Sequence, residues 1–494
     1  MQNDPFSAAP GLDSSLESGA ESDSDSLRAV FHPRSVAVVG ASRDPDKIGG
    51  RLFRYVRDRG FPGPVYPIGP GSEPVQGAEP IPSIEDLPSP ADLVFVVVPA
   101  PAVPDAVRGA ADRGCGACVV VSSGFAESGP EGELLQEQVE VIARDTDMRI
   151  VGPNCMGVMN PRLGLFGTFM SALDEVELTP GNVALISQSG AFGTHAAVLL
   201  RNRGLHLSLW CTTGNECDVD VGDGITCAAR DEDTEVIVAY LEGCRDIEKL
   251  EAALAVASET RKPIVALKSG GTDPGAAAAR AHTAADAGDD ALFSEIFERN
   301  GVYRARTIEE LIDVASACAS NAFPNGRRVG LMTISGGVGV MMADAAVRAG
   351  LEVAPMPVPV EAELKALLPF ASGRNPVDCT AQAFNDWSLL DHFLDAVVRR
   401  GGYDSVVLFL ATVGANPAVM DPIMDRLEEV RRAHPDRVMA LSLIIDDERR
   451  RRLERAGFLV FEDPTRAVNT VAAVAHIGDH LFRRRPGPVR SAGK

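Results

Sequence analysis

Residues 35–42 read SVAVVGAS, an apolar run that ends in a glycine and a serine. A short run of β-branched residues without polar alternation is typical of a strand buried on both faces of a parallel sheet. Four similar runs follow before residue 155, PVYPIG, DLVFVVVP, ACVVVSSG and RIVGPN, with helical stretches near 47–59, 101–114 and 130–145. Strands that alternate with helices form parallel sheets with right-handed crossovers, so this part of the chain predicts a doubly wound domain.

The same alternation recurs twice further along the chain. A second set of strand-like runs comprises NVALISQSG, LSLWCTTGN, EVIVAYLEG and PIVALKSG, and a third comprises RVGLMTISGG, LEVAPMP, SVVLFLAT, RVMALSLII and FLVFED. We therefore predict an α/β chain of three doubly wound parallel-sheet domains. The predicted bounds are a disordered acidic tail at 1–26, domains at 27–153, 154–321 and 327–482, and a basic tail at 483–494.

The composition disfavours several classes of protein. The chain of 494 residues carries a formal net charge of -22, which argues against nucleic acid as a partner because phosphate binding needs a basic surface. No apolar run approaches the ~18 residues that a membrane helix needs, and the N-terminus lacks a secretory signal pattern. Nine scattered cysteines fit a reducing cytoplasm, and the C-x-x-C at Cys115–Cys118 has no second pair to complete a metal site, so no metal is expected.

Small and polar residues directly follow the strands of the first predicted domain. Open α/β sheets bind ligands at the carboxyl ends of their strands. The loop at Gly40 lacks the G-x-G-x-x-G spacing, and VYPIGP lacks the acidic residue that would hold an NAD ribose, so a dehydrogenase is disfavoured. A plain strand-to-helix turn stays open as the alternative. The candidate cofactor-binding residues at these strand ends are Gly40, Ala41, Ser42, Val98, Pro99, Ser123, Gly124 and Phe125.

In the second predicted domain, Ser189 and Gly190 follow a strand and are expected to open a helix. The free N–H groups and the dipole at a helix N-terminus form a natural phosphate site. A serine N-cap with glycines for close packing is the alternative. The chain contains neither G-x-x-x-x-G-K-[ST] nor G-x-S-x-G, which disfavours a P-loop kinase and an α/β serine hydrolase.

Glu242 and His282 are the candidate catalytic residues. Glu242 ends the strand EVIVAYLEG, where a buried carboxylate needs a partner. A histidine would suit, because a carboxylate on one ring nitrogen fixes the tautomer and leaves the other nitrogen to react. Pairing with an arginine or capping of a helix is equally open. His282 stands in AAARAHTAADAGDD, after the strand and glycine-rich loop KPIVALKSGG, and is either a surface residue or the reacting group.

Taken together, several stretches resemble the NDP-forming acyl-CoA synthetase superfamily, which includes succinyl-CoA synthetase, in its α-type half. They include SVAVVGAS, GFAESG, VGPNCMGVMNP, ISQSGAFG, GNECDVDVGD, KPIVALKSGG, ISGGVGVMMAD and NPVD. The resemblance implies a Rossmann-like CoA-binding domain followed by two flavodoxin-like ligase domains. It further implies that His282 is phosphorylated during turnover, that Glu242 orients it, and that Ser189 and Gly190 bind phosphate.

The implied activity is that of an ADP-forming acid–CoA ligase subunit, which joins a small carboxylic acid to CoA through an acyl phosphate and a phosphohistidine. ATP or ADP and Mg²⁺ are then expected on a separate ATP-grasp β-type partner. The loop after His282 departs from the family's usual T-G-A-L-A-G-S-D at Ala284, Asp286 and Asp289. Two alternatives therefore stay open, a non-catalytic CoA or acyl-CoA sensor and a related acyl- or carbamoyl-transferring enzyme.

Overall fold

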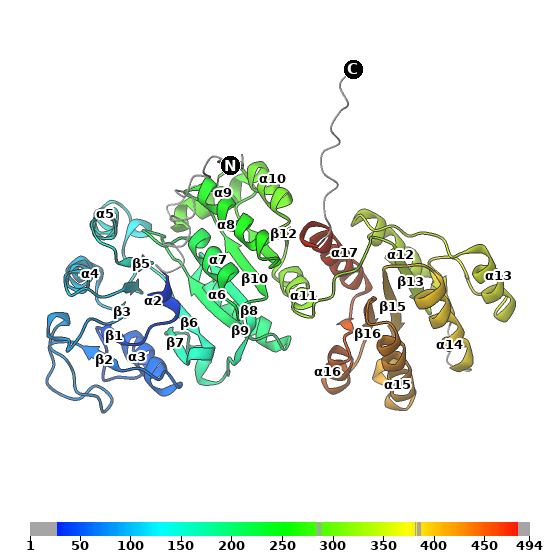
Figure 1. Cartoon of the computed structure of the whole chain (residues 1–494), viewed down its shortest axis with the longest axis horizontal. Helices are drawn as coiled ribbons and strands as arrows, with labels where there is room; N and C mark the ends of the chain where they lie inside the picture. The colour runs from blue at the N-terminus through cyan, green and yellow to red at the C-terminus, as the bar shows by residue number, and fades with distance from the viewer. Residues whose placement is uncertain (1–26, 284–287, 381, 383–386, 483–494) are drawn as a thin grey trace, which may run out of the picture.

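The computed structural model describes residues 27–283, 288–380, 382 and 387–482. Its three sheets have five, seven and five strands. Figure 1 shows three α/β units in a row, one around each sheet, running from blue through green to red. The predicted fold class, α/β with three doubly wound sheets, is confirmed. The tails predicted at 1–26 and 483–494 lie outside the described residues, and the domain bounds stay predictions.

The first sheet has the order β2-β1-β3-β4-β5, and every neighbouring pair is parallel. Its strands are β1 (Val36–Val39), β2 (Val65–Ile68), β3 (Leu93–Val96), β4 (Ala117–Val120) and β5 (Arg149–Val151). Its helices are α2 (Arg28–Phe31), α3 (Ile48–Asp58), α4 (Val103–Asp112) and α5 (Pro130–Asp145). Because the chain turns back between β1 and β3, their carboxyl ends border the crevice where doubly wound sheets bind ligands.

The second sheet has the order β12-β11-β10-β8-β9-β6-β7. Its strands are β6 (Gly157–Asn160), β7 (Leu165–Thr168), β8 (Pro180–Ser187), β9 (Leu207–Thr212), β10 (Val236–Leu241), β11 (Ile264–Lys268) and β12 (Tyr303–Arg304). The pairs β6–β7 and β6–β9 are antiparallel, and this antiparallel edge is not among the predicted strands. Its helices are α6 (Gly190–Asn202), α7 (Val221–Arg230), α8 (Ile247–Glu259), α9 (Asp273–Thr283), α10 (Asp290–Asn300) and α11 (Ile308–Ala319).

The third sheet has the order β14-β13-β15-β16-β17 and is parallel. Its strands are β13 (Val329–Thr333), β14 (Val377–Asp378), β15 (Ser405–Ala411), β16 (Val438–Leu443) and β17 (Leu459–Phe461). Its α-helices are α12 (Gly336–Arg348), α13 (Val358–Leu367), α14 (Trp387–Asp395), α15 (Pro417–Ala433), α16 (Asp447–Arg455) and α17 (Pro464–Leu481). The strand predicted at LEVAPMP is wrong, because only an isolated bridge at Glu352 forms there and the prolines that follow cannot donate to a ladder.

The second and third units meet through α11 and α17, which lie between them in Figure 1. One continuous apolar cluster joins Leu311 on α11 to Val471 on α17. At its edge the carboxylate of Asp313, 2% exposed, accepts hydrogen bonds from Arg203 at 2.8 Å and from Arg466 at 2.9 Å. Both the apolar contact and this buried ion cluster therefore fix the third unit against the second.

Candidate functional site

A pocket of about 830 Å³ lies where the carboxyl edge of the first sheet faces the start of α6. Among the predicted site residues, those that line it are Gly40, Ser42, Val98, Pro99, Ser123, Ser189 and Gly190. They come from loops at 40–42, 98–99, 123 and 189–190, which are distant in the chain, and the topology gathers them because each loop follows a parallel strand. A concave volume of this size is in the range of small-molecule and cofactor sites.

Two helix N-termini open onto this pocket. Helix α3 begins after Lys47, whose side chain makes no capping hydrogen bond, and Lys47 itself lines the pocket. Helix α6 begins after Ser189, whose Oγ accepts from the Phe192 N–H at 3.3 Å. The serine is therefore an N-cap, as the alternative reading held, while the other N–H groups of the first turn remain available to an anion.

Gly40 has a packing reason to be glycine. Its φ is +89°, and a Cβ there would overlap the carbonyl oxygen of Val97. A Cβ on Gly190 would overlap the side chain of Met156. Both glycines therefore let backbone approach backbone or side chain at the pocket wall.

Three predicted residues lie elsewhere. Ala41 lines a neighbouring pocket of about 470 Å³ beside Ile68. The N–H groups of Gly124 and Phe125 donate to the Oε1 atom of Glu127, at 2.6 and 3.1 Å, and the Phe125 ring is fully buried in the core of the first unit. The assignment of all these residues to a cofactor stays a prediction.

Glu242 directly follows β10 and is buried, and the peptide groups on both its sides are held by side chains. Its N–H donates to the Oε1 atom of Gln188 at 2.5 Å. Its carbonyl oxygen accepts from Lys268 Nζ at 3.1 Å. Burial lowers the pKa of Lys268, and the nearby Glu242 charge opposes that shift. Glu242 thus lies on a rigid strand end beside the loop that leads from β11 into α9.

His282 lies in the last turn of α9, which starts just beyond the carboxyl end of β11. The helix also lies beside the segment Ala126–Ser128 of the first unit. The side chain of His282, and the predicted departures at Ala284 and Asp286, lie outside what the structure describes. Asp289 caps α10, because its Oδ1 accepts from the Ala291 N–H at 2.9 Å.

A buried polar network links the two units behind the pocket. Asn215 Nδ2 donates to Glu127 Oε2 at 2.6 Å and to Gln136 Oε1 at 3.0 Å. Burial raises the pKa of Glu127, but the hydrogen bond from Asn215, together with those from the backbone of Gly124 and Phe125, outweighs it and lowers the pKa overall. The ionised carboxylate of Glu127 therefore ties its own loop to the second unit.

Glu216, which follows Asn215 in the chain, is buried in the second unit. Its Oε1 atom accepts from Thr213 Oγ1 at 2.8 Å and from the Val221 N–H at 2.9 Å, and its Oε2 atom accepts from Gln188 Nε2 at 2.8 Å. Burial, assisted by the charge of Asp220, raises the pKa of Glu216 to about 7.

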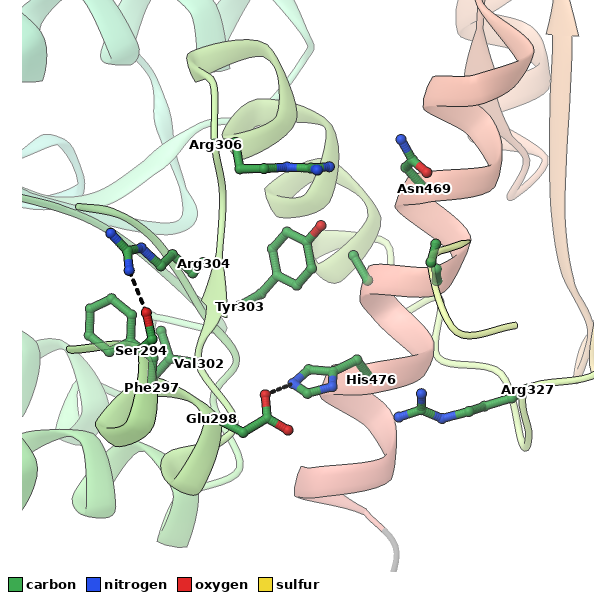
Figure 2. Close-up of a pocket in the computed structure, with 13 residues that line it drawn as sticks. Ser294, Phe297, Glu298, Val302, Tyr303, Arg304, Arg306, Arg327, Asn469 and His476 are labelled. Carbon is green, nitrogen blue, oxygen red and sulfur yellow. Dashed lines mark hydrogen bonds and ion pairs between the residues drawn. The ribbon is translucent and has the colours of Figure 1, made fainter. Parts of the chain in front are cut away.

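A smaller pocket of about 370 Å³ lies between the second and third units and contains none of the predicted site residues (Figure 2). The charged side chains that line it are paired with neighbouring residues of the two units. Arg304 binds Asp290 and Ser294, Arg327 binds Asp479, and His476 lies 3.7 Å from Glu298. In the described parts of the chain, no cluster of three or more His, Cys, Asp or Glu residues could hold a metal ion. Within the same residues, no helix is long and apolar enough to cross a membrane.

Comparison with known proteins assigns this architecture. Residues 34–161 match the CoA binding domain, 180–318 the succinyl-CoA ligase like flavodoxin domain and 329–479 the Ligase-CoA domain. The acetate–CoA ligase (ADP-forming) I subunit alpha of Pyrococcus furiosus is 34% identical over 455 residues, which cover 91% of this chain and 97% of that one. The chain belongs to the ADP-forming acyl-CoA synthetase family.

Solved structures of this family have the same fold. The apo form of the dinucleotide forming acetyl-coenzyme A synthetase 1 of Ca. Korarchaeum cryptofilum aligns with a TM-score of 0.81 and 28% identity, over 92% of this chain and 98% of that one. The complex of the same protein with phosphate and ADP aligns with a TM-score of 0.80 and 30% identity, over 92% and 97%. The family resemblance expected from the sequence is therefore confirmed.

The sequence interpretation of this synthetase-family chain missed Lys47, Gln188, Asn215 and Glu216. Lys47 could have been identified as a candidate anion-binding residue from the sequence. It stands between the loop at Gly40 and the start of a helix, where a lysine is well placed to meet an anion. Gln188 stands at the carboxyl end of a buried strand, where an amide needs several partners. Its partners at 216, 242 and 243 are distant in the chain, so no local pattern identifies them.

Proposed function

We propose that this chain is the α-type subunit of an ADP-forming acid–CoA ligase, which interconverts acid, CoA and ATP with acyl-CoA, ADP and phosphate. The pocket that carries this proposal lies between the strand ends of the CoA binding domain and the N-terminus of α6. It is also lined by Gln188, whose side chain is hydrogen-bonded to the N–H of Glu242. A thiol ester is therefore made beside a helix N-terminus suited to phosphate. The family's named relatives support the same activity.

The lining suits CoA. Lys47 and the first turn of α3 offer donors for phosphate, Ser42 and Ser123 offer hydroxyls, and Val98 contributes apolar surface. When bound, CoA supplies the thiol sulfur that attacks the acyl carbon of an acyl phosphate and releases phosphate. The chain's own part is to hold the ligand's phosphates at α3 and to keep the leaving phosphate near Ser189 and the start of α6.

His282 carries the phosphoryl group in this proposal. In the direction of acyl-CoA synthesis, a neutral ring nitrogen of His282 attacks the γ-phosphorus of ATP. The bond from that phosphorus to the β-phosphate oxygen breaks, and ADP leaves with the electron pair. A carboxylate oxygen of the acid then attacks that phosphorus, and the P–N bond breaks to return its electron pair to the ring. Glu242 accepts the N–H of the other ring nitrogen, so the reacting nitrogen keeps its lone pair.

Nucleotide and Mg²⁺ bind a separate ATP-grasp β-type subunit in this proposal. The chain has no P-loop, and it spans nearly all of a relative that is named as an alpha subunit. α9, with His282 in its last turn, would carry phosphate between the two subunits. We also propose a cytoplasmic location, which the nine free cysteines support.

The test uses the chain together with an ATP-grasp partner, Mg²⁺ and γ-labelled ATP. Acid-labile, base-stable label is expected on this chain, and His282→Ala should abolish it. Calorimetry provides the matched control, because His282→Ala should bind CoA as the wild type does and neither chain should bind NAD. A wild type that binds CoA but stays unlabelled would establish the sensor alternative instead.

A further inference from the structure

Gln188 has a buried side-chain amide that uses its full hydrogen-bonding capacity. Its Oε1 atom accepts from the N–H groups of Glu242 at 2.5 Å and of Gly243 at 3.1 Å. Its Nε2 atom donates to the Gly243 carbonyl oxygen at 2.9 Å and to Glu216 Oε2 at 2.8 Å. An amide offers two donor hydrogens and two acceptor lone pairs, so every position is occupied.

Three backbone groups and the carboxylate of Glu216 together set the orientation of this amide. If the amide turned over, its NH₂ group would face the two N–H donors of Glu242 and Gly243. Its oxygen would then face the Gly243 carbonyl, which cannot donate, and the Oε2 atom of Glu216, which can donate only when the carboxyl group is protonated. Only an acceptor at Oε2 of Glu216 matches the observed orientation, and an amide at 216 would set its NH₂ group against Gln188 Nε2 or, turned over, against the N–H of Val221.

Glu216 is itself fixed from the opposite side. Thr213 Oγ1 and the N–H of Val221, the first residue of α7, both donate to its Oε1 atom. Its carboxylate therefore links the N-terminus of α7, through Gln188, to the peptide that carries Glu242. Lys268 holds the other end of that peptide at its carbonyl oxygen.

We infer that Glu216 is a positioning residue for phosphoryl transfer, acting through Gln188 on the backbone of Glu242. The inference rests on the proposed function, in which the Glu242 carboxylate orients His282. A displacement of that carboxylate by about 1 Å can slow a reaction by about a hundredfold. Glu216 touches no reacting atom, so its effect reaches the chemistry only through this hydrogen-bond chain.

The test replaces Glu216 by the isosteric Glu216→Gln, with the initial rate of His282 labelling from γ-labelled ATP and the partner subunit as the readout. The rate should fall about 10- to 100-fold, while CoA binding by calorimetry remains. The double variant Gln188→Glu with Glu216→Gln exchanges the two groups. Position 188 again accepts from Glu242 and Gly243, position 216 now donates, and only the Gly243 carbonyl loses its donor.

The double variant should recover most of the lost rate. Urea unfolding of both variants separates positioning from loss of stability, because positioning predicts a slower labelling rate even where the chain is fully folded. If the single variant does not fold, the labelling rate of the folded double variant is compared with that of the wild type, and a rate near that of the wild type supports the inference. The inference would be overturned if Glu216→Gln were labelled at the wild-type rate, or if the folded double variant were labelled no faster than the single variant. Either result would leave the proposed function intact. A wild type without label would refute both.

Discussion

Removal of the Asp313 carboxylate should loosen the third unit from the second. Asp313 is 2% exposed, and it accepts hydrogen bonds from two guanidinium groups that are 22% and 26% exposed, those of Arg203 and Arg466. Breaking a buried ion cluster by removing one member costs about 3–5 kcal/mol. Because water reaches part of both arginines, we expect about 2–4 kcal/mol for Asp313→Ala.

Calorimetric unfolding of the full chain measures this loss. A unit of this size loses about 2–4 °C of melting temperature per kcal/mol, so the transition of the joined units should fall by roughly 5–15 °C. The matched control is Glu309→Ala, which removes a carboxylate that is 61% exposed and pairs with the same Arg466. An exposed pair is worth about 0–1 kcal/mol, so this control should melt close to the wild type. Equal melting of the two variants would refute the reasoning.

Three further outcomes are expected. Gly40→Ala should lower CoA affinity in calorimetry, because φ there is +89° and a Cβ would overlap a strand carbonyl, whereas Gly69→Ala, with nothing within 4 Å, should not. Lys47→Ala should weaken CoA binding about 3- to 10-fold with an unchanged fold, since one phosphate donor is lost; unchanged affinity would remove Lys47 from the site. Burial, then the charge of Asp220, raises the pKa of Glu216 from 4.5 to about 7. The native state therefore loses about 3 kcal/mol as pH rises between these values. Glu216→Gln should gain relative stability over that window in urea unfolding, and a pH-independent difference would contradict this.

Most strand positions could be predicted because a long buried parallel strand is a local apolar run, whereas β12 and β14, with two residues each, are not among the predicted strands. The antiparallel pair β6 and β7 could not be predicted, since short glycine-containing strands at a sheet edge show no such run. LEVAPMP misled for the opposite reason, because its apolar side chains fit a strand while Pro355 and Pro357 lack the N–H groups that a ladder needs.

The candidate site divides in the same way. Strand-end residues such as Ser42 and Ser189 follow from the rule that parallel strands share a carboxyl edge. Phe125 shows the limit of that rule, because its ring turns into the core while its N–H serves Glu127. The interactions of Gln188 and Glu216 depend on tertiary contacts between three loops, which no single stretch of sequence encodes.

The pocket's charges have a consequence for the speed of binding. The lining has one lysine and one aspartate, Lys47 and Asp46, whereas the whole chain carries a net charge of -22. An approaching polyanion is therefore repelled at long range and attracted at short range by Lys47 and the helix ends. Salt screens the long-range field within about 8–10 Å but leaves the enclosed contacts nearly intact. Added salt thus accelerates the arrival of an anionic ligand, in contrast to a basic groove, where salt slows it.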